Sequence, residues 1–192
     1  ESIVQGSNGG YGKCLIQAKH HMKGIVFTEF MEMVEQKFGY EMVDELLTGT
    51  DLPSGGAYTS IGTYSHHEMV SLVVGLSQKT ELPIPTLLYT FGQHLFQTFA
   101  KSYGQFFEGV PDAFTFLESI ERYIHVEVKK LYPDAELPRF QTKRLDEKTL
   151  EMIYHSERSM GDLAHGLIAS SLEYFNEKAE NHRESMEDGG KI

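Results

Sequence analysis

The sequence predicts an α+β fold, in which helices fill the N-terminal part, an antiparallel sheet follows, and one more helix comes after the sheet. Three observations support this prediction. As far as about residue 132, apolar residues recur at the three- and four-residue spacing of amphipathic helices. After Pro133 two short segments have strand character, and beyond Ser159 the helical spacing returns. Helices and strands that are segregated along one chain in this way favour an α+β domain.

Four helices are predicted in the N-terminal half. The first ends at Gly39, where the apolar spacing stops, and the second covers residues 42–48. The third is expected to begin at Ser65, because Glu68 stands three residues further on, as in a capping box. The fourth begins near Pro85 and carries large apolar side chains on one face.

The C-terminal half carries one long helix, two strands and a final helix. The long helix is predicted over residues 114–132 and ends before Pro133. Residues 137–142 and 149–155 are predicted strands, joined by a polar turn. The final helix is expected to begin at residues 159–162, where Ser-Met-Gly-Asp is similar to a capping box.

Composition restricts the class of protein. With 192 residues, 40% of them hydrophobic and 23% charged, the chain suits one soluble globular domain. Its net charge of −11 disfavours a nucleic-acid partner and would suit a basic patch on a protein. No run of about 18 apolar residues is present, so no membrane span is expected. The single cysteine, Cys14, cannot form an internal disulfide or a multi-cysteine metal site, which indicates a cytoplasmic protein.

The two ends of the chain differ from its centre. We expect residues 1–21 to be an N-terminal extension outside the native domain and residues 22–192 to form the domain, because Met22 resembles a natural start. The turn-like sequence from Asp188 enters no further strand, so the final strand of the sheet is expected to be missing. Residues 13–18 could pair at that edge instead.

The most informative residues are one helical histidine and a polar motif downstream of it. His125 stands on an otherwise apolar helix, where a neutral imidazole can bind iron. In Tyr154-His155-Ser156-Glu157-Arg158, residues two apart would share one face of an extended segment. Tyr154, Ser156 and Arg158 could therefore direct two hydroxyls and a guanidinium at one anionic group. A haem requires an axial ligand for its iron and a clamp for its two propionates. Taken alone, the histidine also fits an ordinary core histidine, and the polar motif also fits a solvated strand.

Together, in this order, His125 and the Tyr-x-Ser-x-Arg motif resemble the haem nitric oxide/oxygen-binding (H-NOX) domain, which is also the sensor domain of soluble guanylate cyclase. The resemblance to bacterial members extends from Met22 to about Lys178. Four further segments carry it: Met22-Lys23-Gly24-Ile25-Val26-Phe27, Phe91-Gly92-Gln93-His94, Leu131-Tyr132-Pro133 and Leu137-Pro138-Arg139-Phe140. It implies a mostly helical H-NOX fold, with an N-terminal helical subdomain, a C-terminal antiparallel sheet with helices, and haem b between them.

The resemblance also implies roles for residues around that haem. His125 is implied as the proximal ligand of the iron, and the motif that ends in Arg158 as the propionate clamp. Pro138 matches a proline that presses on the porphyrin and bends it. Gly92 lies in the middle of a helix, where glycine costs about 1 kcal/mol relative to alanine. Close helix packing would explain this glycine, and so would its family role as a pivot for the N-terminal helices.

The positions that match the distal pocket of the family are all apolar. They are Val26, Phe30, Leu95, Phe99, Leu163 and Leu167. Oxygen bound to ferrous iron needs a hydrogen-bond donor, whereas NO binds tightly without one. Oxygen-binding members of the family use a tyrosine at the position of Leu163, so its absence implies the NO-selective branch. The same side chains would also be plain core.

Five other histidines have simpler interpretations. His94 is expected to be a core or subunit-facing residue one position before the distal pocket. His155 lies between the clamp residues and should point to the opposite face of the strand. His165 is expected on the helix surface or in packing, and His66 and His67 as exposed polar surface.

The implied function is a cytoplasmic haem b sensor without turnover, which binds NO, and CO less usefully, while it excludes oxygen. In the family, NO breaks the iron–histidine bond, the haem relaxes against the proline, and the N-terminal helices rotate. A histidine kinase or a cyclic-di-GMP enzyme commonly reads that change. Three alternatives remain: an oxygen sensor or carrier, a haem enzyme such as a peroxidase, and a haem-free helical interaction domain. The first lacks a distal donor and the second a distal acid–base residue.

Overall fold

The computed structural model describes residues 21–180. The expected extension up to residue 20, the pairing of residues 13–18 and the missing strand after Asp188 lie outside these residues. His21, the last residue assigned to the extension, belongs to strand β1 (His21–Lys23), which pairs antiparallel with β2 (Thr63–Ser65). Strands of three residues are too short to show alternation, so the sequence did not predict this small sheet.

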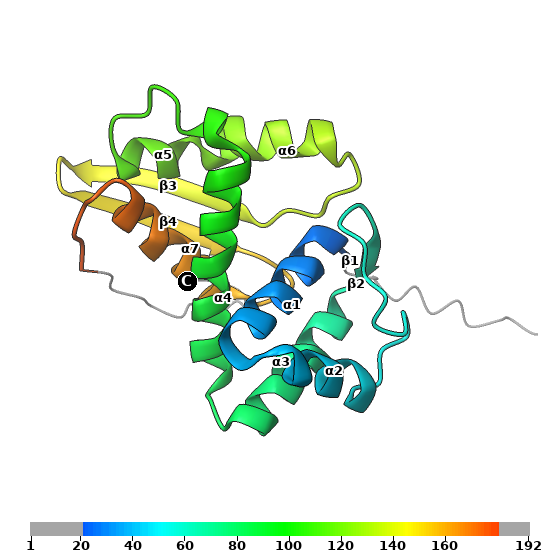
Figure 1. Cartoon of the computed structure of the whole chain (residues 1–192). Helices are drawn as coiled ribbons and strands as arrows, with labels where there is room; N and C mark the ends of the chain where they lie inside the picture. The colour runs from blue at the N-terminus through cyan, green and yellow to red at the C-terminus, as the bar shows by residue number, and fades with distance from the viewer. Residues whose placement is uncertain (1–20, 181–192) are drawn as a thin grey trace, which may run out of the picture.

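The N-terminal subdomain consists of four helices, as predicted (Figure 1). They are α1 (Gly24–Phe38), α2 (Tyr40–Gly49), α3 (His66–Thr80) and α4 (Ile84–Ser102). Gly39 ends α1 with φ of 90°, a conformation that glycine adopts without strain. The side chain of Ser65 caps α3 by accepting from the backbone N–H of His67 at 3.3 Å.

Two details of α3 differ from the prediction. Glu68 does not complete a capping box, because its carboxylate accepts hydrogen bonds from the hydroxyls of Ser54 and Tyr58. The expectation that His66 is exposed is wrong, since only 7% of this residue is accessible. His66 lies in the first turn of a helix that packs one face into the core, and that face includes it. His67 is exposed, as expected.

The C-terminal part begins with a short 3-10 turn, η1 (Gly104–Phe106), and a helix of three pieces. These pieces are α5 (Ala113–Ser119), the π-helical turn η2 (Ile120–Ile124) and α6 (His125–Leu131). The single helix predicted over residues 114–132 is therefore interrupted by a π turn immediately before His125. The sequence reasoning did not anticipate this turn, because π turns are rare and occur as single turns inside otherwise α-helical segments.

A hairpin and a last helix complete the fold. Strand β3 (Arg139–Asp146) pairs antiparallel with β4 (Thr149–His155), with Phe140 opposite Tyr154, and α7 (Gly161–Tyr174) follows. The expected capping box before α7 is wrong. Met160 occupies the cap position without a side-chain hydrogen bond, and Ser159 has φ of 50° in the preceding turn.

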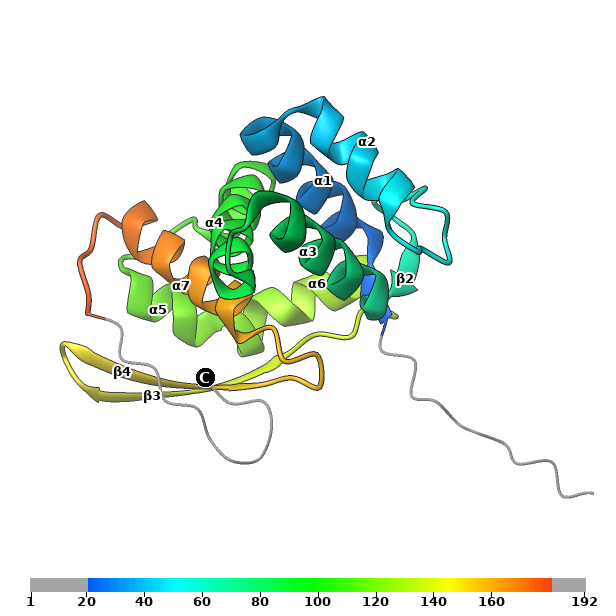
Figure 2. The same ribbon diagram turned by 90° about the horizontal axis from the view of Figure 1, so that it is seen from below.

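Helix α4 lies between the N-terminal helices and the hairpin, and α5 and α7 cover one face of the hairpin (Figure 2). Phe91 of α4 belongs to the larger core cluster with α1, α2 and α3, whereas Phe96, one turn on, belongs to a smaller cluster with Phe116 and Leu117 of α5. One helix thus connects the two halves of the molecule. No helix of residues 21–180 is long and apolar enough to cross a membrane.

Candidate functional site

A cavity of about 290 Å³ lies between the two halves of the molecule. Side chains from α1, α4, η2, α6, the hairpin and α7 line it, and most of them are apolar. Ten of the predicted site residues lie in its wall: His125, Tyr154, Ser156, Arg158, Pro138, Val26, Leu95, Phe99, Leu163 and Leu167. Segments that are far apart in the sequence therefore meet at one apolar space.

His125 is positioned by a carboxylate one turn earlier. Its Nδ1 lies 2.9 Å from Oε1 of Glu121, and the backbone N–H of Phe140 donates to the same oxygen at 2.9 Å. A carboxylate only accepts, so Nδ1 carries the proton and Nε2 keeps its lone pair. Burial lowers the pKa of His125 below its ordinary value, although Glu121 opposes this effect. The site therefore offers a neutral, oriented imidazole at the cavity wall.

The sequence did not predict the role of Glu121. The only available signal was its position four residues before His125, which places both residues on one helix face. A glutamate at that spacing is usually part of a solvated surface, so the signal was weak.

Tyr154, Ser156 and Arg158 all line the cavity, but strand alternation alone does not bring them there. Strand β4 ends at His155, so only Tyr154 points inward from extended backbone, and the other two follow in a turn. The hydroxyl of Ser156 accepts from the backbone N–H of Arg158 at 3.2 Å. Burial raises the pKa of Tyr154, which keeps this phenol protonated and able to donate.

Arg158 also donates hydrogen bonds to two backbone carbonyls. Nη1 donates to the backbone carbonyl of His21 at 2.9 Å, and Nη2 donates to the carbonyl of Glu136. Burial lowers the pKa of the guanidinium from its ordinary value, yet the group remains charged at any physiological pH. Because a guanidinium has five N–H donors, two carbonyl contacts leave donors for an anionic group in the cavity.

The wall formed by α1, α4 and α7 is hydrocarbon. Val26, Leu95, Phe99, Leu163 and Leu167 lie in it. The sixth predicted position, Phe30, does not line the cavity. It is fully buried in the larger core cluster, with its ring edge-to-face against Phe91 at 5.2 Å between centroids. An apolar side chain suits core and pocket equally, so sequence reasoning could not separate the two.

Gly92 is the point where α4 crosses α7. A Cβ added at Gly92 would lie 2.2 Å from the carbonyl oxygen of Leu163, and one at Gly166 would lie 2.0 Å from that of Tyr89. The two glycines face each other, since each such Cβ would be 3.0 Å from the Cα of the other glycine. This geometry supports the close-packing interpretation of Gly92. Gly166 was missed, although a glycine inside a helix carries the same signal.

The remaining histidines lie away from the cavity wall. His155 is not among the lining residues, in agreement with the expectation that it faces away from Tyr154 and Ser156. The ring of His165 packs against Tyr89 at 5.1 Å between centroids. His94 is half-buried between α4 and α1, where its Nε2 lies 3.2 Å from Oε2 of Glu29.

The donor set of the cavity defines a class of protein. A neutral imidazole suits iron, a guanidinium with two hydroxyls suits propionates, and a hydrocarbon wall suits a porphyrin face. These residues fit a haem-binding domain. The chain belongs to the H-NOX family, because the haem-NO-binding family model matches residues 23–183.

Solved structures agree with this membership. An unliganded Fe(II) H-NOX protein from K. algicida is 46% identical, with a TM-score of 0.83, 88% of this chain covered and 92% of that one. An H-NOX protein from S. oneidensis in the Fe(II)NO state is 27% identical, with a TM-score of 0.82 and coverage of 88% and 96%. The H-NOX from Shewanella woodyi, bound to IWP-051 in the Fe(II)CO state, is 42% identical, with a TM-score of 0.72 and coverage of 82% and 83%. No curated protein matches the chain.

Proposed function

We propose that this chain is a non-enzymatic gas sensor of the cytoplasm, which binds NO at ferrous haem b and excludes oxygen. The observation that carries the proposal is the hydrocarbon wall of α1, α4 and α7. Every side chain that these three helices contribute to the cavity is apolar. Bound oxygen needs a donor on its distal side and NO does not, so such a wall favours NO.

Among the described residues, the phenol closest in sequence to this wall is engaged elsewhere. Tyr103 directly follows α4 and lines the cavity, and so does Tyr132. Burial is the first reason why the pKa of Tyr103 is raised, and the interaction with Tyr132 is the next. This interaction with Tyr132 makes Tyr103 a poor candidate for a distal donor.

The proximal residues provide the binding and orientation. His125 would hold the iron through Nε2, and Tyr154, Ser156 and Arg158 would hold the propionates. When bound, the haem supplies the iron position at which a diatomic gas binds. Pro138 would touch the porphyrin from the segment that leads into β3, which matches the position of this proline in the cavity wall.

The output of the sensor would begin at His125. Glu121 contacts both His125 and the backbone of Phe140, so a displacement of the imidazole would also move the start of β3. The π turn before His125 supports this proposal, because such turns often mark functional positions in helices. A separate protein, either a histidine kinase or a cyclic-di-GMP enzyme, would read the change. NO-dependent inhibition or activation of such a purified partner by the loaded chain is the corresponding assay.

The absorption spectrum of the reduced protein tests the proposed ligand selectivity. The ferrous protein should show the same spectrum in air and under argon, and it should change on addition of NO. A split visible band that forms in air-equilibrated buffer would show oxygen binding and would favour an oxygen sensor or carrier. A purified chain that takes up no haem would favour the haem-free interaction domain.

A further inference from the structure

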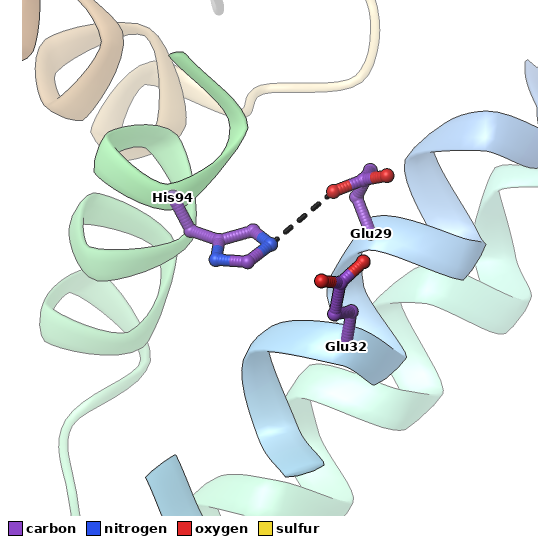
Figure 3. Close-up of side chains that lie close together, drawn as sticks. All are labelled: Glu29, Glu32 and His94. Carbon is purple, nitrogen blue, oxygen red and sulfur yellow. Dashed lines mark hydrogen bonds and ion pairs between the residues drawn. The ribbon is translucent and has the colours of Figure 1, made fainter. Parts of the chain in front are cut away.

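Three side chains that can bind a metal ion meet between α1 and α4, outside the cavity (Figure 3). Glu29 and Glu32 come from α1 and His94 from α4, and one ligand atom of each lies within 4.8 Å of the others. The spacing of Glu29 and Glu32 places both on one face of α1, and Figure 3 shows both directed toward the imidazole.

The two carboxylates have no cationic partner of the ordinary kind. Among the ion pairs of residues 21–180, neither Glu29 nor Glu32 is paired with a lysine or arginine. Glu29 and His94 are enclosed, with side-chain exposures of 13% and 11%. Glu32 is exposed, but its carboxylate lies beside that of the enclosed Glu29, and neighbouring carboxylates repel each other unless positive charge is supplied. A divalent cation would neutralise both of them.

We propose that Glu29, Glu32 and His94 bind one divalent transition-metal ion of the zinc type. One imidazole nitrogen and two carboxylate oxygens are a suitable donor set for Zn²⁺, with water as the fourth ligand. Imidazole disfavours Mg²⁺ and Ca²⁺, which prefer oxygen ligands alone. The 3.2 Å between Nε2 of His94 and Oε2 of Glu29 suits two ligands that share a tetrahedral ion at about 2.0–2.1 Å.

A further residue holds the site in place. The hydroxyl of Thr98, one turn after His94, donates to Oε2 of Glu29 at 2.8 Å. Groups that bind the ligands of a metal in this way orient them and typically contribute 10- to 100-fold in affinity. Gln36 donates to Oε1 of Glu32 at 3.0 Å, which restrains the more exposed carboxylate.

The ion would connect the two helices that form one side of the cavity. Val26 lies one turn before Glu29 on α1, and Leu95 and Phe99 directly follow His94 and Thr98 on α4. A metal ion that bridges Glu29 and His94 would therefore fix the distance between α1 and α4 directly behind the hydrocarbon wall. The existence of the site does not depend on the proposed gas selectivity.

Equilibrium dialysis of the haem-loaded chain against Zn²⁺, with metal analysis, tests the proposal. After removal of bound metals by a chelator, the wild type should retain one more Zn²⁺ per chain than Glu29→Gln or His94→Asn. Glu35→Gln and His67→Asn are matched controls, because both residues are exposed, and they should retain the wild-type amount. Since the comparison is a difference between variants, binding to other histidines does not affect it.

Two further measurements separate loss of the site from loss of the fold. Glu32 is exposed, so Glu32→Gln should keep the wild-type absorption spectrum and melting temperature without Zn²⁺ and still bind Zn²⁺ at least about tenfold more weakly. Thr98→Val should weaken binding about 10- to 100-fold. Equal Zn²⁺ binding by the wild type, Glu32→Gln and His94→Asn would overturn the proposal, and so would a wild type that retains none.

Discussion

On the side of the cavity formed by η2, α6 and the start of β3, polar atoms are fixed by directional hydrogen bonds, whereas the side formed by α1, α4 and α7 presents hydrocarbon. Glu121 orients His125 on the first side, and on the second side Leu95, Leu163 and Leu167 contribute only van der Waals surface. Where directional hydrogen bonds hold a group, single residues determine its binding, whereas many residues together determine the properties of an apolar wall. Substitutions on the two sides should therefore differ in the size of their effects.

The largest effect is expected at His125. His125→Gly should yield a protein that loses haem or holds it only with added imidazole, because the only protein bond to the iron is removed. The ratio of haem absorbance to protein absorbance after gel filtration measures the loss, and His67→Gly provides an exposed histidine as the control. A ferrous spectrum identical to that of the wild type would refute the assignment of His125 as the ligand.

The clamp residues should have a smaller effect, and a graded one. Charged hydrogen bonds contribute about 1.5–3 kcal/mol and neutral ones about 0.5–1.5 kcal/mol. Arg158→Ala should therefore speed haem loss roughly ten- to hundredfold and Ser156→Ala roughly two- to tenfold, measured by transfer of haem to an acceptor protein in excess. Arg158→Lys keeps the positive charge but not the forked donors of the guanidinium, so its rate of haem loss should lie between the rates of these two variants. Rates equal to that of the wild type would exclude a clamp role for this motif.

The crossing of α4 and α7 tests how the hydrocarbon wall is supported. Gly166→Ala places a methyl group only 2.0 Å from the carbonyl oxygen of Tyr89, so the two helices must separate. Overpacking of this kind costs about 1–3 kcal/mol in the free energy of unfolding, measurable by urea denaturation. Gly49→Ala is the matched control, because nothing lies within 4 Å of its new methyl group. If both variants had the same midpoint and slope, close backbone packing would not stabilise this wall.

The smallest effect is expected from a single polar group in the hydrocarbon wall. Leu163→Tyr adds a phenol on the α7 side of the cavity, but Leu95 and Phe99 offer no second polar group to orient it. A net hydrogen bond of about 0.5–1.5 kcal/mol would increase oxygen affinity by roughly two- to tenfold. Oxygen titration of the ferrous variant, with Leu163→Phe as the control for size, measures this gain. A larger increase would mean that the wall selects the gas through one position rather than collectively.

The same contrast explains what the sequence could predict. Apolar spacing located the main helices and the strands of the hairpin, and the family motif singled out His125 and the residues up to Arg158, which share one cavity, because both signals are local. Phe30 was placed in the cavity and lies in the core, since burial by protein and burial by a cofactor select the same side chain. Glu121 and the π turn escaped prediction because their role depends on the position of β3, which no local pattern encodes.

Glycine and histidine positions show a second limit. Gly166 makes sense only opposite Gly92, and such a pair becomes visible when the crossing of two helices is known. His66 and His67 are adjacent in the sequence, yet the first is buried and the second is exposed, because α3 turns them to different sides. Contacts between distant segments decide these cases.

Arg158 links the occupancy of the cavity to the order of the first strand. The guanidinium lines the cavity and also donates to the carbonyl of His21 in β1 and to that of Glu136, close to Pro138. An anion that holds the guanidinium in this position would lower the entropy cost of both carbonyl contacts. By linkage, a well-ordered β1 would strengthen binding of the anion by the same free energy. Retention of an anionic cofactor and the order of β1 would therefore be reciprocal equilibria that share the side chain of Arg158.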